Sequence, residues 1–145
     1  MSQRPDRRNG QRAERLLKQL LAAGAIVEIG VGLGALVFPE PLIGLLLNAP
    51  VAATGIFVAR VFGAAIIALG LTWWVARGEP RGRGASGCDL GFISYNLGAG
   101  LVILLQALAA TQPVPLLWPV AFLHAGLGLG FAAVLLGRSP VPEAK

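Results

Sequence analysis

The sequence predicts an all-α fold, a four-transmembrane-helix bundle, and three observations carry this prediction. Of the 145 residues, 55% are apolar and only 13% are charged, about half the charged share of a soluble domain, and the mean hydropathy is +0.70. The apolar residues gather in four long stretches, each of about 20 residues or more, which is the length that crosses a bilayer. Alanine, leucine, glycine and valine dominate these stretches, as in closely packed membrane helices.

The ends of the expected elements follow from the prolines and the polar residues. The first span stops at Pro39, since proline cannot continue a helix. The apolar segment Leu42–Leu47 is flanked by prolines and too short to cross, so it predicts a short interfacial segment between the first two spans. The expected division is a polar basic segment at 1–15, a transmembrane domain at 16–137 with spans at 16–38, 51–77, 90–110 and 116–136, and a polar tail at 138–145.

The distribution of positive charge predicts the orientation. Of the 12 Lys and Arg residues, 11 lie near the N-terminus, in the central loop or in the C-terminal tail, and the other one is Arg60. The positive-inside rule therefore predicts that both termini of this multi-pass protein are cytoplasmic. These basic residues lack interleaved aromatic side chains, so the net charge of +5 indicates contact with the lipid bilayer and no nucleic acid.

Single residues exclude several kinds of chemistry. One cysteine, Cys88, excludes an internal disulfide and CxxC redox chemistry. One histidine, His124, cannot form a bis-His haem site, and one histidine with one cysteine cannot form a zinc cluster. No metal site is predicted, no cofactor is specified, and no nucleophile–base pair is visible, so the catalytic residues are unknown.

Charged residues inside the spans are the first candidates for a site. Arg60 is costly in hydrocarbon, so we expect it to face protein, water or a negative partner. At 1.5 Å per residue, Glu28 and Arg60 lie roughly 14 Å from the outer ends of their spans, and His124 lies about 12 Å from that of its own span. Three ionisable groups on three helices are therefore expected at one level.

The third expected span adds polar residues to this set. Tyr95 and Asn96 lie toward the cytoplasmic side, and Gln106 lies nearer the outside. Small residues flank the polar ones, as Gly24 and Gly32 flank Glu28, so we expect all the polar faces to point into the bundle. The candidates for a ligand or proton site are Glu28, Arg60, Tyr95, Asn96, Gln106 and His124.

Two interpretations of this layer remain open. In the first, Glu28 and Arg60 form a buried ion pair that is purely structural, and His124 and Tyr95 support it with hydrogen bonds. In the second, the layer lines a pocket for an anionic or polar headgroup, a quinone, or a proton in transit.

Other motifs suggest packing. Glycine pairs with GxxxG spacing at Gly30 and Gly34, and at Gly126 and Gly130, suggest a second helix contact or an oligomer seam. The tryptophans near span ends are interpreted as an aromatic belt at the membrane surface. They are Trp73, Trp74 and Trp118.

Several short motifs together resemble a known group of proteins. They are the run VARVFGAAIIALG at 58–70, the following Trp73-Trp74 and Ala76-Arg77, Tyr95-Asn96, and Phe122-Leu123-His124. This pattern resembles uncharacterised small four-helix bacterial inner-membrane proteins, which are loosely DoxX-like. Some DoxX-like proteins are linked to quinone-dependent redox complexes, so the resemblance implies a four-helix architecture and an inner-membrane location, and it brings no catalytic residue. Glu28 also resembles the membrane-embedded glutamate of small multidrug transporters, although Arg60 departs from their pattern.

Three functional hypotheses follow. The leading one is a non-enzymatic subunit or binder of a lipid- or quinone-like molecule, working as a homo-oligomer or within a larger membrane complex. The alternative is a small dimeric proton-coupled transporter that uses Glu28 as its titrating group. The third is a membrane enzyme, which the lack of a nucleophile–base pair or a metal set disfavours.

Overall fold

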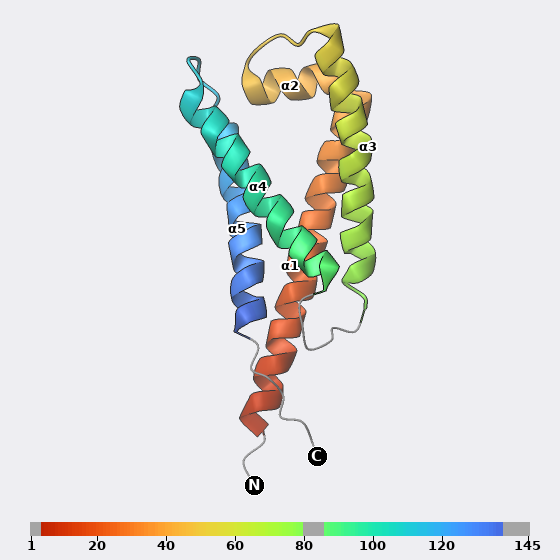
Figure 1. The fold of residues 1–145 in the computed structure, drawn as a ribbon, viewed down its shortest axis with the longest axis vertical. Coiled ribbons are helices and arrows are strands. Elements are labelled where there is room, and N and C mark those ends of the chain that lie inside the picture. The colour runs from red at the N-terminus through yellow and green to blue at the C-terminus, as the bar shows by residue number, and fades with distance from the viewer. Residues whose placement is uncertain (1–3, 80–85, 138–145) are drawn as a thin grey trace.

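The computed structural model describes residues 4–79 and 86–137, and these residues form five helices and no strand (Figure 1). The helices are α1 (Arg4–Val37), α2 (Pro39–Leu47), α3 (Ala53–Ala76), α4 (Gly87–Ala109) and α5 (Leu117–Leu136). All but α2 are long and apolar enough to cross a membrane, so the predicted all-α bundle with four spans is confirmed. The polar tail at 138–145 and the loop arginines Arg81 and Arg83 lie outside the described residues.

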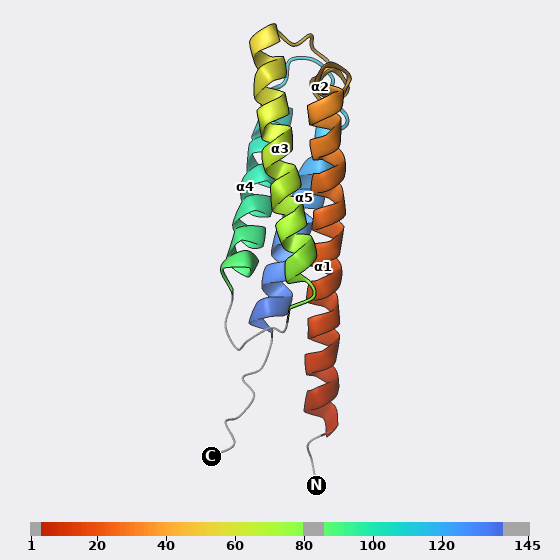
Figure 2. The ribbon, with the colours of Figure 1, turned by 90° about the vertical axis from the view of Figure 1, so that its right-hand side faces the viewer.

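Helix α1 is much longer than the span expected at 16–38. It contains 34 residues, which corresponds to about 50 Å, and its first part extends beyond the other helices (Figure 2). Residues 11–18 are mostly strong helix formers, and the ion pair between Glu14 and Lys18, at 2.9 Å, joins two successive turns. The basic segment 1–15, which was predicted to be separate from the first span, is therefore helical from Arg4 onward and continuous with that span.

A sharp corner separates α1 from α2. Phe38 leaves the helical conformation, with φ at −127° and ψ at 56°, as the following proline requires, and Pro39 starts α2. Asn48 ends α2 in the left-handed conformation, with φ at 50°, and its N–H donates to the carbonyl oxygen of Gly44. Helix α2 lies across one end of the bundle (Figure 1), and its Leu46 packs against a second hydrophobic cluster, formed by Ala107, Val114 and Leu117.

The long helices pair as two antiparallel hairpins, α1 with α3 and α4 with α5. Glycines allow the close approach within each hairpin: a Cβ added at Gly63 of α3 would lie 2.7 Å from the carbonyl oxygen of Gly32 in α1. In the second hairpin, a Cβ at Gly100 would lie 3.1 Å from the backbone nitrogen of Ala125. These glycines belong to the tight contacts, whereas Gly30 and Gly126 face open space.

Helix α4 begins with a capping box, three residues before the expected start of its span. The Ser86 hydroxyl accepts from the Asp89 N–H at 3.1 Å, and the Asp89 carboxylate accepts from the Ser86 N–H at 3.0 Å. This reciprocal pair explains why a buried aspartate, 2% exposed, occurs at this end of α4.

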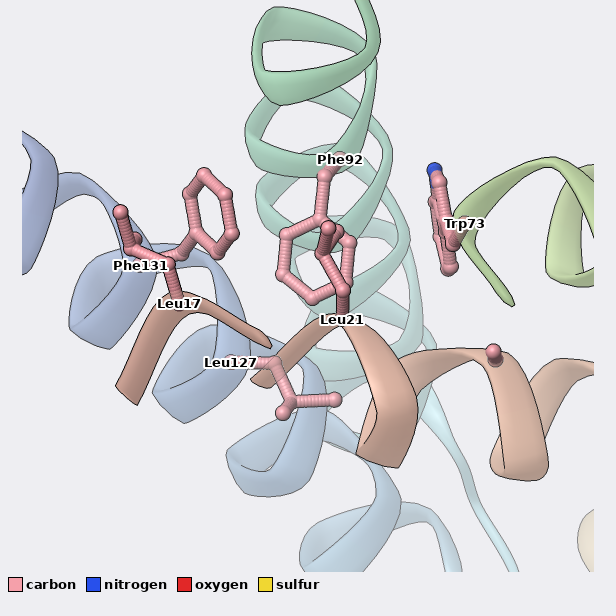
Figure 3. Packing of buried hydrophobic residues seen from close by; sticks show 7 residues of the cluster. Leu17, Leu21, Trp73, Phe92, Leu127 and Phe131 are labelled. Carbon is pink, nitrogen blue, oxygen red and sulfur yellow. The ribbon is translucent and has the colours of Figure 1, made fainter. Parts of the chain in front are cut away.

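One hydrophobic cluster joins the two hairpins near the start of α4 (Figure 3). Phe92 lies between Trp73 and Phe131, with ring centroids 4.6 and 4.8 Å away. Trp73 is 1% exposed, so its assignment to an aromatic belt is corrected: it continues the stripe of α3 residues that packs on α1 and reaches the core. Trp74 and Trp118 are exposed, and the Arg77 guanidinium lies 3.6 Å from the centre of the Trp74 ring.

The hairpins separate toward the end that carries α2 (Figure 1). Tyr95 contacts α1, whereas Val102, two turns further along the same face of α4, is 65% exposed. The outer faces of all four long helices are apolar as well. Examples are Ile26, Phe57, Leu108 and Phe122, which are 62–68% exposed. Such a surface suits lipid and is unusual for a protein that faces water.

Candidate functional site

Glu28 lies at the centre of the candidate site, in the part of α1 that faces α4 and α5. It is 2% exposed, and its Oε2 atom accepts a hydrogen bond of 2.8 Å from the Tyr95 hydroxyl of α4. Gly24 and Gly32, one turn to either side, lie against Phe92 and Gly63, as their small size predicted. The glutamate is thus held where α1 packs closely on its neighbours.

Asn96 and His124 form the second part of the site, between α4 and α5. The Asn96 amide nitrogen donates to the carbonyl oxygen of Phe92 at 2.9 Å, which leaves Oδ1 as an acceptor. His124 Nδ1 lies 3.1 Å from this Oδ1 and therefore carries a hydrogen that it donates to Asn96. Both residues are buried, at 0% and 6% exposed.

The two parts meet at the second oxygen of Glu28. Oε1 lies 3.9 Å from Nδ1 of His124, too far for a hydrogen bond, and it is buried without any hydrogen-bond partner. Buried polar atoms without a partner are rare and costly, so this oxygen has the capacity for one more hydrogen bond. We call Glu28, Tyr95, Asn96 and His124 the polar cluster.

Aromatic rings enclose the polar cluster on the side of the hydrophobic core. The Tyr95 ring lies 5.5 Å from Trp73 and 5.9 Å from His124, both edge-on. Neither Trp73 nor Phe92 was among the residues predicted from the sequence to lie at the site. The spacing from Gly63 through Gly70 to Trp73, which puts all three on one face of α3, is the signal that predicts an inward tryptophan.

Arg60 does not join the polar cluster, and the expected layer of three ionisable groups is corrected. Its side chain is exposed, and it lines a hollow with residues of the α1–α2 corner. Gly63 of α3 packs against Ala35, near the end of α1. Because α3 runs antiparallel to α1, the residues that precede Gly63 lie at and beyond that end. Arg60 therefore lies about 15 Å further along the bundle than Glu28. The depths counted from the sequence were wrong because they assumed that the spans end at one level.

Gln106 is also outside the polar cluster. It was expected to point into the bundle, and it shares the face of α4 that carries Tyr95, yet its side chain is exposed. The reason is the separation of the hairpins: α4 moves away from α1 toward the end that carries α2 (Figure 1), and Gln106 lies in the last turn of α4.

The fold and the site together define a multi-pass helical membrane protein with one buried polar cluster between two hairpins. Among residues 4–79 and 86–137, no group of three or more His, Cys, Asp and Glu side chains is placed to hold a metal ion. Comparisons with protein families, with curated proteins and with solved structures give no match.

Proposed function

We propose that this chain is a bacterial inner-membrane protein, loosely DoxX-like, whose polar cluster binds a lipid- or quinone-like molecule without catalysing a reaction. The observation that carries the proposal is Oε1 of Glu28, a buried carboxyl oxygen that lacks a partner beside the Nδ1–H of His124. Polar and ionisable groups inside a membrane bundle are costly and mark functional sites by default.

The chemistry of the polar cluster favours a ligand that carries an oxygen on a ring or a headgroup. An ionised Glu28 offers Oε1 as an acceptor to a ligand hydroxyl, and a protonated Glu28 donates to a ligand carbonyl. A quinone oxygen accepts and a quinol oxygen donates, so either redox form completes this hydrogen bond. The edges of Tyr95 and Trp73 provide an apolar wall for the ring.

The separation of the hairpins provides the way in. Val31, one turn beyond Glu28 on α1, is 38% exposed, and Val102 on the Tyr95 face of α4 is 65% exposed. These apolar faces lie between the polar cluster and α2, so a molecule dissolved in the bilayer enters from the side. No water-filled route is needed.

Ligand binding can be measured through the fluorescence of Trp73. In a variant with Trp74→Phe and Trp118→Phe, Trp73 is the one remaining tryptophan, and decylubiquinone bound beside Tyr95 quenches its selectively excited fluorescence. We expect saturable quenching by decylubiquinone in detergent micelles. Glu28→Gln and Tyr95→Phe should each weaken the apparent affinity about tenfold or more, the effect of losing a buried hydrogen bond.

Gln106→Leu is the matched control, because Gln106 lies on the same helix face as Tyr95 and outside the polar cluster. It should bind decylubiquinone like the parent protein. Equal quenching in all variants, at matched unfolding midpoints, would show that the quinone does not use this cluster.

One observation favours the second candidate, a small dimeric proton-coupled transporter. Arg60 is remote from Glu28, so it does not neutralise the carboxylate, and the objection to a transporter of the small multidrug type is weaker. Ethidium uptake into proteoliposomes tests it: the transporter predicts uptake driven by a pH gradient, retained in Glu28→Asp and abolished in Glu28→Gln. Quinone quenching without ethidium uptake in the parent protein decides for the binder.

A further inference from the structure

The corner between α1 and α2 forms a hollow at a different place from the polar cluster. Its volume is about 270 Å³, and residues of the corner line it together with Ile56 and Arg60 of α3. The corner residues are Val37, Phe38, Pro39, Glu40 and Pro41. The hollow therefore has apolar walls and two charged groups of opposite sign.

Arg60 is the cation of this hollow. It lies seven residues into α3, about 10 Å from the first residue of that helix, on a face that is exposed and otherwise apolar. A long arginine side chain at this depth extends toward the headgroup layer, where its charge is stabilised. Within the described parts of the chain, Arg60 takes part in no ion pair.

Glu40 is the anion of this hollow, in the first turn of α2. Its side chain is exposed, and no ion pair within 4.0 Å joins it to Arg60 or to another described residue. Two opposite charges thus line one hollow without neutralising each other. Helix α2 crosses the end of the bundle (Figure 1), so we place this hollow at the level of the lipid headgroups.

We propose that this hollow is a binding site for the headgroup of a zwitterionic phospholipid with a primary amine, a phosphatidylethanolamine. The Arg60 guanidinium binds the phosphate, for which its planar set of donors is well suited. The Glu40 carboxylate accepts hydrogen bonds from the ammonium group. The apolar side chains Val37, Phe38 and Ile56 contact the start of the acyl chains. The lipid phosphate thus gives Arg60 the negative partner that an arginine within a membrane span needs.

The test is lipid retention by the detergent-purified full chain, measured by native mass spectrometry. The protein is incubated with equal amounts of phosphatidylethanolamine, phosphatidylcholine and phosphatidylglycerol that have the same acyl chains. We expect at least threefold more retained phosphatidylethanolamine than either other lipid. Phosphatidylcholine lacks ammonium N–H donors for Glu40, and phosphatidylglycerol lacks the cation.

Three variants separate the roles of the two charges. Arg60→Gln should lower phosphatidylethanolamine retention fivefold or more, whereas Arg60→Lys should retain it within about twofold. Glu40→Gln should remove the preference over phosphatidylglycerol. The control is Arg8→Gln, which removes one exposed positive charge from the polar part of α1 and should leave retention unchanged.

Three results would overturn the proposal. They are equal retention by Arg60→Gln and Arg8→Gln at matched unfolding midpoints, a preference of the parent protein for phosphatidylglycerol, and displacement of the retained lipid by free phosphoethanolamine at millimolar concentration. Trp73 quenching by decylubiquinone is expected to be the same in Arg60→Gln, so failure here is distinct from failure of the quinone proposal.

Discussion

Glu28 buries a carboxyl group among three helices with only one of its oxygens hydrogen-bonded. The Tyr95 hydroxyl is the described donor to that carboxyl, and its loss leaves both oxygens without a partner. An unsatisfied buried group costs about 1–3 kcal/mol. Tyr95 therefore contributes directly to the stability of the polar cluster.

Tyr95→Phe should lower the free energy of unfolding by about 1–3 kcal/mol, because it removes this donor and leaves the ring in place. The measurement is unfolding in detergent micelles followed by circular dichroism. In a double-mutant cycle with Glu28→Gln, the combined loss should be smaller than the sum of the single losses. Trp118→Phe, a change at an exposed aromatic residue outside the cluster, is the control. If Tyr95→Phe is as stable as this control, the hydrogen bond contributes nothing.

The sequence identified four residues of the polar cluster because each is polar, lies inside an apolar span and has small neighbours. These are Glu28, Tyr95, Asn96 and His124. It could not place Arg60, since the distance of a residue from the end of its helix says nothing about how far that helix extends beyond its neighbour. That offset depends on where Gly63 meets the end of α1.

At the scale of the elements, the α1–α3 contact depends on two facing glycines. Gly32 and Gly63 each lie where a Cβ would be 2.7 Å from the carbonyl oxygen of the other residue, and backbone cannot give way as a side chain can. Gly30, on the opposite part of α1, has nothing within 4 Å. The same substitution at these positions should therefore have opposite consequences.

Gly63→Ala should lower the free energy of unfolding by about 1–3 kcal/mol, because the two helices must move apart. Gly30→Ala should leave it unchanged or raise it by up to about 1 kcal/mol, since alanine favours helix more than glycine does. Detergent unfolding midpoints check both. A destabilised Gly30→Ala would indicate instead that this open face is occupied by another helix in solution.

The spans themselves were predictable because apolar length alone specifies them. The start of α1 at Arg4 was not, because a polar helix outside the bilayer leaves no trace in hydropathy. The start of α4 was predictable from a local motif that does not affect hydropathy. The sequence Ser86-Gly-Cys-Asp89 has capping-box spacing, and the structure contains that box.

At the scale of the whole molecule, the beginning of α1 and the end of α5 lie at the same end of the bundle, opposite α2 (Figure 2). This arrangement follows from an even number of spans. The side of the membrane on which that end lies stays a prediction from the positive charges.

Labelling of single cysteines in intact bacterial cells checks this orientation. In a Cys88→Ser background, Thr111→Cys lies in the loop between α4 and α5, and Glu79→Cys lies at the opposite end. A membrane-impermeant maleimide should label Thr111→Cys in whole cells and Glu79→Cys only after lysis. The reverse pattern would mean that the protein is inserted the other way round.

The length of α1 has a mechanical consequence. The helix is unbroken from Arg4 to Val37, and its first 13 residues, about 20 Å, precede the first core residue, Leu17. Because the helix is continuous, a partner that bound the segment around Arg8 would act on the same element that carries the Glu28 carboxyl. Binding at the protruding part of α1 would therefore be coupled, through one helix, to the buried hydrogen bond between Tyr95 and Glu28.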